Sequence, residues 1–141
     1  MQTFLPYPDI EKSVRCLDSR RLGKQRIEAY QILNILLKRT KSNAWKNHPT
    51  VKMWEGYENA LKLYLNMCIK EWIRRGYRNN MKLEEIKGRV LFPKWFGNEE
   101  FHSSHRSNLL RKDKKYYSKF GWEEEDNLPY TWPVSKDKQK L

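Results

Sequence analysis

The chain has 141 residues, enough for one ordinary domain with a buried core. Its 29 Lys and Arg residues outnumber its 17 Asp and Glu residues, which gives a formal net charge of +12 at pH 7. A charge of this size repels itself in the folded state, and a polyanionic partner such as nucleic acid relieves that repulsion. No apolar run spans a bilayer and the first residues lack a signal-peptide pattern, so we expect neither a membrane protein nor a secreted one.

Apolar residues recur with helical spacing through most of the chain, and no alternation is strong enough for a sheet. The sequence therefore predicts a compact, all-α single domain over residues 1–135, followed by a frayed basic tail at 136–141. Cys16 and Cys68 lie in helix-like sequence without metal-type spacing. They are expected to be reduced packing residues, as is usual in a cytoplasmic protein.

Two helices are expected near the start of the chain. Asp9 is a suitable cap for a short helix that runs to about Leu17, and Asp18 for a second helix that reaches about Lys38. The apolar face of the second helix is expected to contain Ile27, Tyr30, Leu33, Leu36 and Leu37.

The clearest helix is expected to open at Pro49 or Thr50 and to end near Gly76. One helical turn is expected at 83–87, and a further helix at about 98–120. The stripe that predicts the long helix, and that is expected in the core, consists of Trp54, Tyr57, Leu61, Tyr64, Leu65, Cys68 and Trp72.

The segment DSRRLGKQRIEAYQ, residues 18–31, concentrates basic side chains around one acid. In a helix, Arg21, Lys24 and Glu28 share one face, because their spacings are three and four residues. Such a face can hold a phosphate backbone while it keeps an acid available for chemistry. A solvated surface with ion pairs between successive turns is the simpler alternative. The charged residues of the segment that bear on these two interpretations are Arg20, Arg21, Lys24, Arg26 and Glu28.

A second basic tract, HSSHRSNLLRKDKKYY, interleaves cations with aromatic residues, a pattern that suits a nucleic-acid backbone and stacked bases. The alternative is a basic amphipathic helix that docks on the core through Leu109 and Leu110. We expect phosphate contacts, and the residues expected to make them are His102, His105, Arg106, Arg111 and Lys112.

The three histidines, His48, His102 and His105, lack the spacing and carboxylate or cysteine support of a metal site. We therefore expect no metal and no other cofactor, and interpret each histidine as a packing residue or a phosphate contact. His48 is included with the expected DNA-binding residues.

Several motifs cover nearly the whole chain and resemble a bacterial branch of the pyrimidine-dimer DNA glycosylases, the endonuclease V family. They are TFLPYP, LGKQR, HPTVKMWEGYE, SHRSNLLRKD and LPYTWP. The resemblance to the phage enzyme itself is more distant. It lies in the helix after His48, which ends in a basic Arg-Gly-aromatic step, and in the basic tract with its aromatic end.

The resemblance implies an all-α, metal-free DNA glycosylase with AP-lyase activity. Members of the family use their N-terminal α-amine to attack the sugar and form a Schiff base, and β-elimination then cuts the strand. An α-amine suits this step because it loses its proton more readily than a lysine amine. The amine here is that of Met1, with Lys24 as the alternative nucleophile. The family's glutamate follows an arginine early in its first long helix; residues 20–24 contain none, and Glu28 comes about one turn later.

Two interpretations from different classes remain. In the first, a cytoplasmic, nucleoid-associated monomer excises a damaged or modified base from double-stranded DNA, with Glu28 as acid and base. In the second, the chain is a non-catalytic nucleic-acid-binding module that retains the scaffold. A metal-dependent nuclease that uses the histidines is a third and weaker alternative.

Overall fold

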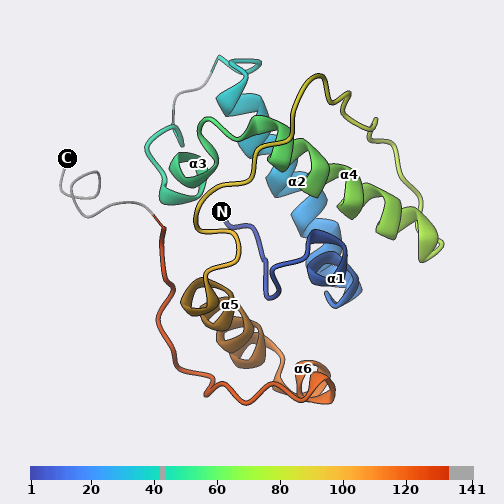
Figure 1. Ribbon diagram of the computed structural model, residues 1–141. Helices are drawn as coiled ribbons and strands as arrows, with labels where there is room; N and C mark the ends of the chain where they lie inside the picture. The colour runs from blue at the N-terminus through green and yellow to red at the C-terminus, as the bar shows by residue number, and fades with distance from the viewer. Residues whose placement is uncertain (42–43, 134–141) are drawn as a thin grey trace.

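The computed structural model describes residues 1–41 and 44–133, and these ranges form helices and irregular segments without strands (Figure 1). The predicted all-α class is thus confirmed. The tail predicted at 136–141 lies outside the described residues. The helices are α1 (Ile10–Arg15), α2 (Ser19–Leu36), α3 (Pro49–Trp54), α4 (Glu58–Arg74), α5 (Glu99–Lys112) and α6 (Lys114–Tyr117), followed by the 3-10 turn η1 (Ser118–Phe120).

The two predicted N-caps are both present. Asp9 accepts a hydrogen bond from the backbone N–H of Lys12 at 2.9 Å, and Asp18 accepts one from that of Arg21 at 3.3 Å. Each carboxylate satisfies a donor that the first turn of a helix leaves without a partner inside the helix.

The prediction of one long helix from Pro49 to Gly76 is wrong, because the chain turns between α3 and α4. Gly56 has φ +88°, a left-handed conformation that a right-handed helix cannot include. Trp54 and Leu61 are nevertheless both buried, so the apolar stripe continues across the break. A periodicity that two successive helices share does not reveal the turn between them.

The helical turn predicted at 83–87 is also wrong. This part of the chain is extended along α4, and side chains of that helix take its backbone groups. Asn66 donates to the carbonyl of Glu84 at 2.9 Å and accepts from its N–H at 2.7 Å, while Lys62 donates to the carbonyl of Glu85 at 3.0 Å. These bonds replace those of a helical turn.

The helix predicted at 98–120 is interrupted at Asp113, which has φ −155° and ψ 78° and separates α5 from α6. Its side chain accepts a hydrogen bond from the N–H of Tyr116 at 3.1 Å and so caps α6.

The core forms mainly where α2 packs along α4 (Figure 1). Ile27 and Tyr30 are 44% and 41% exposed, so the prediction that they belong to the buried face of α2 is wrong. The buried face is rotated away from them because α4 is its partner. Its members are Leu22, Gln25, Ala29, Ile32 and Leu33.

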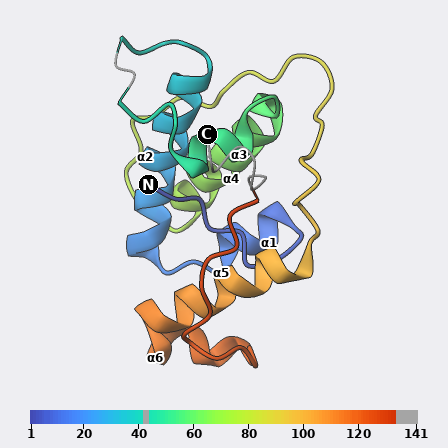
Figure 2. The same cartoon turned by 90° about the vertical axis from the view of Figure 1, so that its left-hand side faces the viewer.

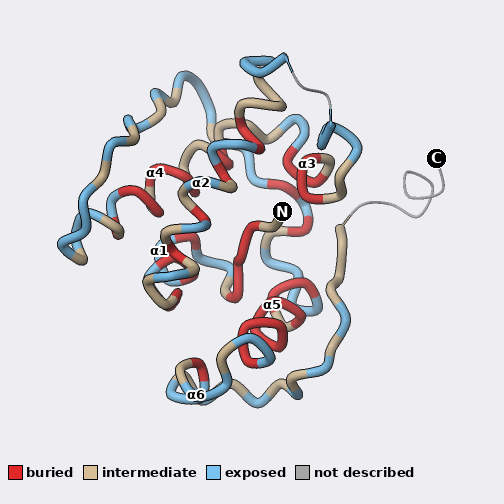
Figure 3. The backbone as a smooth tube through the Cα atoms, turned by 180° about the vertical axis from the view of Figure 1, so that it is seen from behind, coloured by how far each residue is buried: buried red, intermediate tan, exposed pale blue. Residues whose placement is uncertain are grey.

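The N-terminal segment, residues 1–8, is extended and passes through the middle of the molecule. Figure 3 shows it buried as it runs inward from the N-terminus, and Thr3, Phe4 and Leu5 are at most 5% exposed. Extended backbone in the interior needs hydrogen-bond partners from elsewhere in the chain. Those partners lie on α2, α3, α4 and α5, and they position the candidate site.

Candidate active site

Helices α2 and α3 hold the first two residues of the chain. Thr50, at the start of α3, donates a hydrogen bond from Oγ1 to the carbonyl oxygen of Met1 at 2.9 Å. Gln25 of α2 donates from Nε2 to the carbonyl oxygen of Gln2 at 2.9 Å. Two buried polar side chains therefore hold the first two residues of the chain, Thr50 at Met1 and Gln25 at Gln2.

Helix α5 binds the same segment further along the chain. His105 accepts a hydrogen bond at Nδ1 from the N–H of Leu5 at 2.9 Å, and Nδ1 of His102 lies 2.7 Å from the carbonyl oxygen of Leu5. Arg106 donates to the carbonyl oxygen of Pro6 at 2.7 Å. The tract HSSHR thus binds the protein's own backbone.

This arrangement corrects the expectation that His102, His105 and Arg106 contact phosphate. The exposed fractions of these three residues are 0%, 3% and 8%. Burial lowers the pKa of His102 below its ordinary value and lowers that of His105 to about 3, so both rings are neutral near pH 7. Arg106 is paired with Glu99 and with Glu124. The sequence could not separate a buried basic residue from an exposed one.

The first residues of the chain line a basic pocket of about 390 Å³. The N-terminal residue lies beside α2 (Figure 2), and Lys112, the last residue of α5, lines the same pocket. The basic side chains of the pocket come from α2 and α5, and its single carboxylate is that of Glu28. The residues that line it are Met1, Gln2, Phe4, Arg20, Arg21, Lys24, Gln25, Glu28, His48, Lys112 and Trp132.

Glu28 is the half-buried acid of this pocket. Burial raises the pKa of Glu28 above its ordinary value, while the N-terminal amine, Lys24 and Lys112 oppose that rise. A raised carboxyl pKa suits a group that exchanges protons near neutral pH. The three cations that act on Glu28 come from the first residue, α2 and α5, so this acid lies where the three parts of the chain meet.

His48 also lines the pocket, as the N-cap of α3. Burial and the N-terminal amine both lower its pKa. Its Nδ1 accepts a hydrogen bond from the N–H of Thr50 at 3.1 Å, and its ring packs between Trp45 and Trp132. A neutral imidazole in this position adds no charge beside the amine.

Asp18, the other nearby acid in the sequence, is already bound. Burial by itself would raise its pKa, but hydrogen bonds from Tyr117 and Arg21 hold the pKa of Asp18 below its ordinary value. Its carboxylate caps α2 and does not line the pocket.

Two other predicted DNA-binding residues also lie apart from the pocket. The guanidinium of Arg26 lies 4.4 Å from the centre of the Trp72 ring and donates to Asn79 at 2.8 Å. Arg111 is exposed and donates to the carbonyl oxygen of Asp126 at 3.0 Å. Neither residue lines the pocket that contains Glu28.

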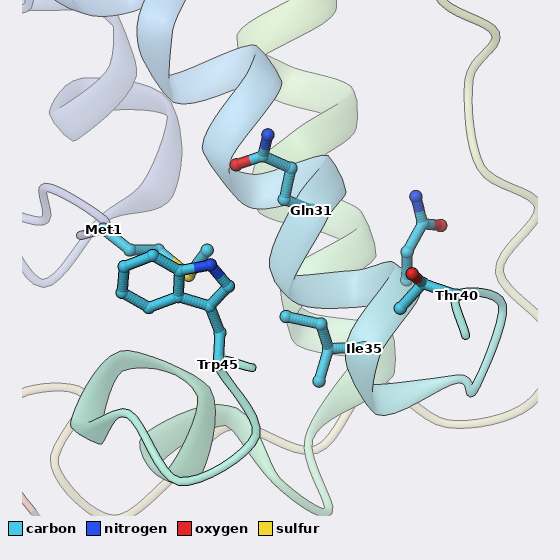
Figure 4. Close-up of a pocket in the computed structure, with 6 residues that line it drawn as sticks. Met1, Gln31, Ile35, Thr40 and Trp45 are labelled. Carbon is cyan, nitrogen blue, oxygen red and sulfur yellow. The ribbon is translucent and has the colours of Figure 1, made fainter. Parts of the chain in front are cut away.

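A second pocket, of about 200 Å³, lies on the other side of the N-terminal residue. Figure 4 shows the side chain of Met1 alongside the ring of Trp45, with Gln31 and Ile35 of α2 facing them. Trp45 is 49% exposed, which is high for a tryptophan. Met1 therefore separates a basic pocket from a smaller one with an accessible aromatic ring.

Two searches of the described residues bear on other classes of site. Within 1–41 and 44–133, no group of three or more His, Cys, Asp and Glu side chains is arranged to hold a metal ion. Over the same ranges, no helix has both the length and the apolar character needed to cross a membrane.

Comparison with known proteins identifies the family. The family model for pyrimidine dimer DNA glycosylase matches residues 1–85, which is more than half of the chain. The chain therefore belongs to this family of DNA glycosylases. Searches of curated proteins and of solved structures gave no match. The matched range contains Met1, Lys24 and Glu28, whereas Lys112 and Trp132 come from beyond it.

Four residues that line the pocket were not predicted from the sequence: Gln2, Phe4, Gln25 and Trp132. Gln25 lies between Lys24 and Arg26 in the sequence, so it had the pattern of an exposed polar residue. The only local signal was its spacing of three residues from Glu28, which places both on one side of the helix.

Proposed function

We propose that this protein excises a damaged base, in the simplest case a pyrimidine dimer, from double-stranded DNA and then cuts the strand as an AP lyase. The observation that carries the proposal is the single basic pocket shared by the N-terminal amine, Lys24 and Glu28. The family match supports the class of enzyme, and the pocket supplies the residue types that the chemistry needs.

In this proposal the neutral amine of Met1 attacks C1′ of the damaged nucleotide, and the bond from C1′ to the base breaks. Opening of the sugar ring leaves an imine between the amine and C1′. Removal of a proton from C2′ then expels the 3′ phosphate, and water hydrolyses the imine. Glu28 takes and returns the protons, for which its half-buried position beside the amine is suited.

The phosphate backbone would lie along the basic rim of the pocket, formed by Arg20, Arg21 and Lys112. Arg20 and Lys112 are exposed, as a phosphate contact requires. Arg21 is partly held by Asp18 at 3.2 Å, which leaves the other edge of its guanidinium for DNA.

The pocket beside Trp45 suits an extrahelical base, because an exposed indole ring offers a stacking surface next to the nucleophile. Trp45→Ala should weaken binding to lesion-containing duplex by about 1 to 3 kcal/mol. The exposed Phe92, which lines neither of these pockets, provides the control change Phe92→Ala. Equal losses in the two variants would remove the Trp45 pocket from the proposal.

Borohydride trapping on duplex DNA with one abasic site tests the chemistry, since reduction of the imine leaves a covalent adduct. We expect an adduct whose peptide map places the DNA on the N-terminal residue, and we expect Lys24→Met to retain it. An adduct on Lys24 would assign the alternative nucleophile. Absence of both the adduct and lesion-dependent cleavage would leave a nucleic-acid-binding module.

Glu28→Gln separates the two classes further. The enzyme proposal predicts that Glu28→Gln retains DNA binding and loses turnover, whereas a binding module shows no turnover in the wild type and binding that Glu28→Gln leaves unchanged. The same assays in EDTA address the nuclease alternative, because a metal-dependent nuclease loses activity there and the proposed amine chemistry does not.

A further inference from the structure

Gln25 is a buried amide whose four hydrogen-bonding positions are all used. It is 1% exposed and lies on α2, three residues before Glu28. Its Oε1 accepts from the N–H of Phe4 at 2.9 Å and from the hydroxyl of Tyr64 at 2.6 Å. Its Nε2 donates to the carbonyl oxygen of Gln2 and to Oε2 of Glu28, both at 2.9 Å.

These partners admit only one orientation of the amide. The N–H of Phe4 can only donate, and the carbonyl oxygen of Gln2 can only accept. A rotated amide would bring its NH₂ group against the N–H and its oxygen against two acceptors. Because burial makes unpaired polar groups unfavourable, the NH₂ group of Gln25 faces both Gln2 and Glu28.

The NH₂ group of Gln25 therefore links Glu28 to Gln2, the residue that follows Met1. Thr50 holds the carbonyl oxygen of Met1 from the other side. The Glu28 carboxylate is thus held relative to the amine by the buried amide of Gln25 and by the backbone of Gln2, whereas Lys24 is exposed.

We propose that Gln25 is a positioning residue of this site, which helps to fix the carboxylate of Glu28 relative to the N-terminal amine by bonding to both segments. The inference rests on the proposed function. A hydrogen bond donated to a carboxylate also favours its ionised form, so the bond from Gln25, like the backbone hydrogen bond from Gln2, counteracts the effect of burial on Glu28.

Gln25→Glu tests the donor and leaves the size of the side chain unchanged. It keeps an oxygen for Phe4 and Tyr64 and replaces the NH₂ group by a second oxygen, which faces the carboxylate of Glu28. The matched control is Asn66→Asp on α4. Asn66 is a buried amide that bridges the N–H and the carbonyl of Glu84 and does not line the pocket.

The first measurement is an NMR titration of the Glu28 carboxyl carbon, which needs no turnover. We expect Gln25→Glu to raise the titration midpoint of Glu28 by about one pH unit or more, because two carboxyl groups then share one site. Asn66→Asp should leave the midpoint unchanged. Gln25→Met, which removes the donor without adding an acid, should also raise the midpoint and serves if Gln25→Glu does not fold. A midpoint that stays at the wild-type value in the folded variant overturns the inference.

The second measurement is the pH dependence of borohydride trapping. In a plot of trapping rate against pH, Gln25→Glu should shift the part of the curve that depends on the protonation of Glu28. The maximal trapping rate should fall on the order of 10-fold to 100-fold, and DNA affinity should stay within about twofold of wild type. Wild-type trapping with an unshifted profile in the variant overturns the inference and leaves the proposed function standing. If the wild type itself forms no adduct, the proposed function fails, and the NMR titration still decides the link between Gln25 and Glu28.

The exchange Gln25→Glu with Glu28→Gln separates positioning from stability. It restores an amide and a carboxylate that can bond to each other, but it moves the acid one turn along α2. We expect thermal stability to recover only in part, because the carboxylate at position 25 still faces the carbonyl oxygen of Gln2, and trapping to stay far below the wild-type rate. Recovery of both would show that Gln25 acts on the fold alone.

Discussion

The backbone N–H of Leu5 donates a hydrogen bond to Nδ1 of His105 over 2.9 Å, although one hundred residues separate the two in sequence. The bond requires a neutral imidazole with its proton on Nε2, and burial lowers the pKa of His105 to about 3. His105, in the second half of the chain, thus holds the segment that begins with Met1, the proposed nucleophile. Protonation of His105 removes the acceptor and opposes folding.

Acid should therefore destabilise the protein partly through His105. The unfolded residue has a pKa near its ordinary value of about 6.5, so between about 6.5 and 3 the unfolded state binds the additional proton. The contribution of His105 to the free energy of unfolding is fully present above this pH range. It declines as the pH falls through the range, by up to about 1.4 kcal/mol per pH unit. Urea unfolding at pH 7 and pH 5 measures the change.

His105→Asn keeps an acceptor for Leu5 without a titrating group. The difference in unfolding free energy between pH 7 and pH 5 should be smaller in this variant by roughly 1 to 2 kcal/mol. Carboxylates such as Asp18 and Glu124 titrate equally in both proteins, so the comparison removes their contribution. Equal pH dependence in the two proteins would contradict a neutral, buried His105.

Thr50→Val should slow trapping because it releases the carbonyl oxygen of Met1. We expect a loss of about 1 kcal/mol in stability, the usual contribution of one hydrogen bond. The control is Thr3→Val, since Thr3 lies in the same segment, is equally buried and accepts from Trp54 at 3.1 Å. If both variants lose similar stability but only Thr50→Val loses trapping rate, the position of Met1 matters for the chemistry. Equal trapping rates would argue against it.

Gly23→Ala should destabilise the protein, although alanine favours helices by about 1 kcal/mol over glycine. A Cβ at Gly23 would lie 3.0 Å from two ring atoms of Trp72. That ring is held on its other sides by Arg26, by stacking on Tyr77 and by its bond to the carbonyl of Arg78. Overpacking of this kind costs about 1 to 3 kcal/mol.

Thermal unfolding of Gly23→Ala should therefore show a lowered Tm, and the second change Trp72→Leu should make the same Gly23→Ala step less harmful. A higher Tm in Gly23→Ala alone would mean that α2 and α4 move apart without penalty.

Lys112→Met should reduce the salt dependence of DNA binding. Each phosphate contact contributes about 0.9 to the slope of log K against log salt concentration, so one contact should be lost from the slope. Lys87→Met is the control, because the Lys87 side chain is 81% exposed and lies beyond α4, away from the pocket. Fluorescence anisotropy with duplex DNA at several salt concentrations gives both slopes. An unchanged slope for Lys112→Met would place the DNA elsewhere.

The sequence by itself determined the features that depend on neighbouring residues. The caps at Asp9 and Asp18 were predictable because a capping carboxylate bonds within its own first turn. The grouping of Arg21, Lys24 and Glu28 was predictable for the same reason, since helical spacing alone places them on one face.

Only the tertiary structure decided which polar residues are buried and what they bind. His105 and Arg106 have the same local pattern as a DNA-binding tract, but their partners are backbone groups of Leu5 and Pro6. Gln25 became recognisable only when Gln2, Phe4 and Tyr64 surrounded it. A side chain's solvation depends on segments that are distant in sequence, and helical periodicity contains no information about them.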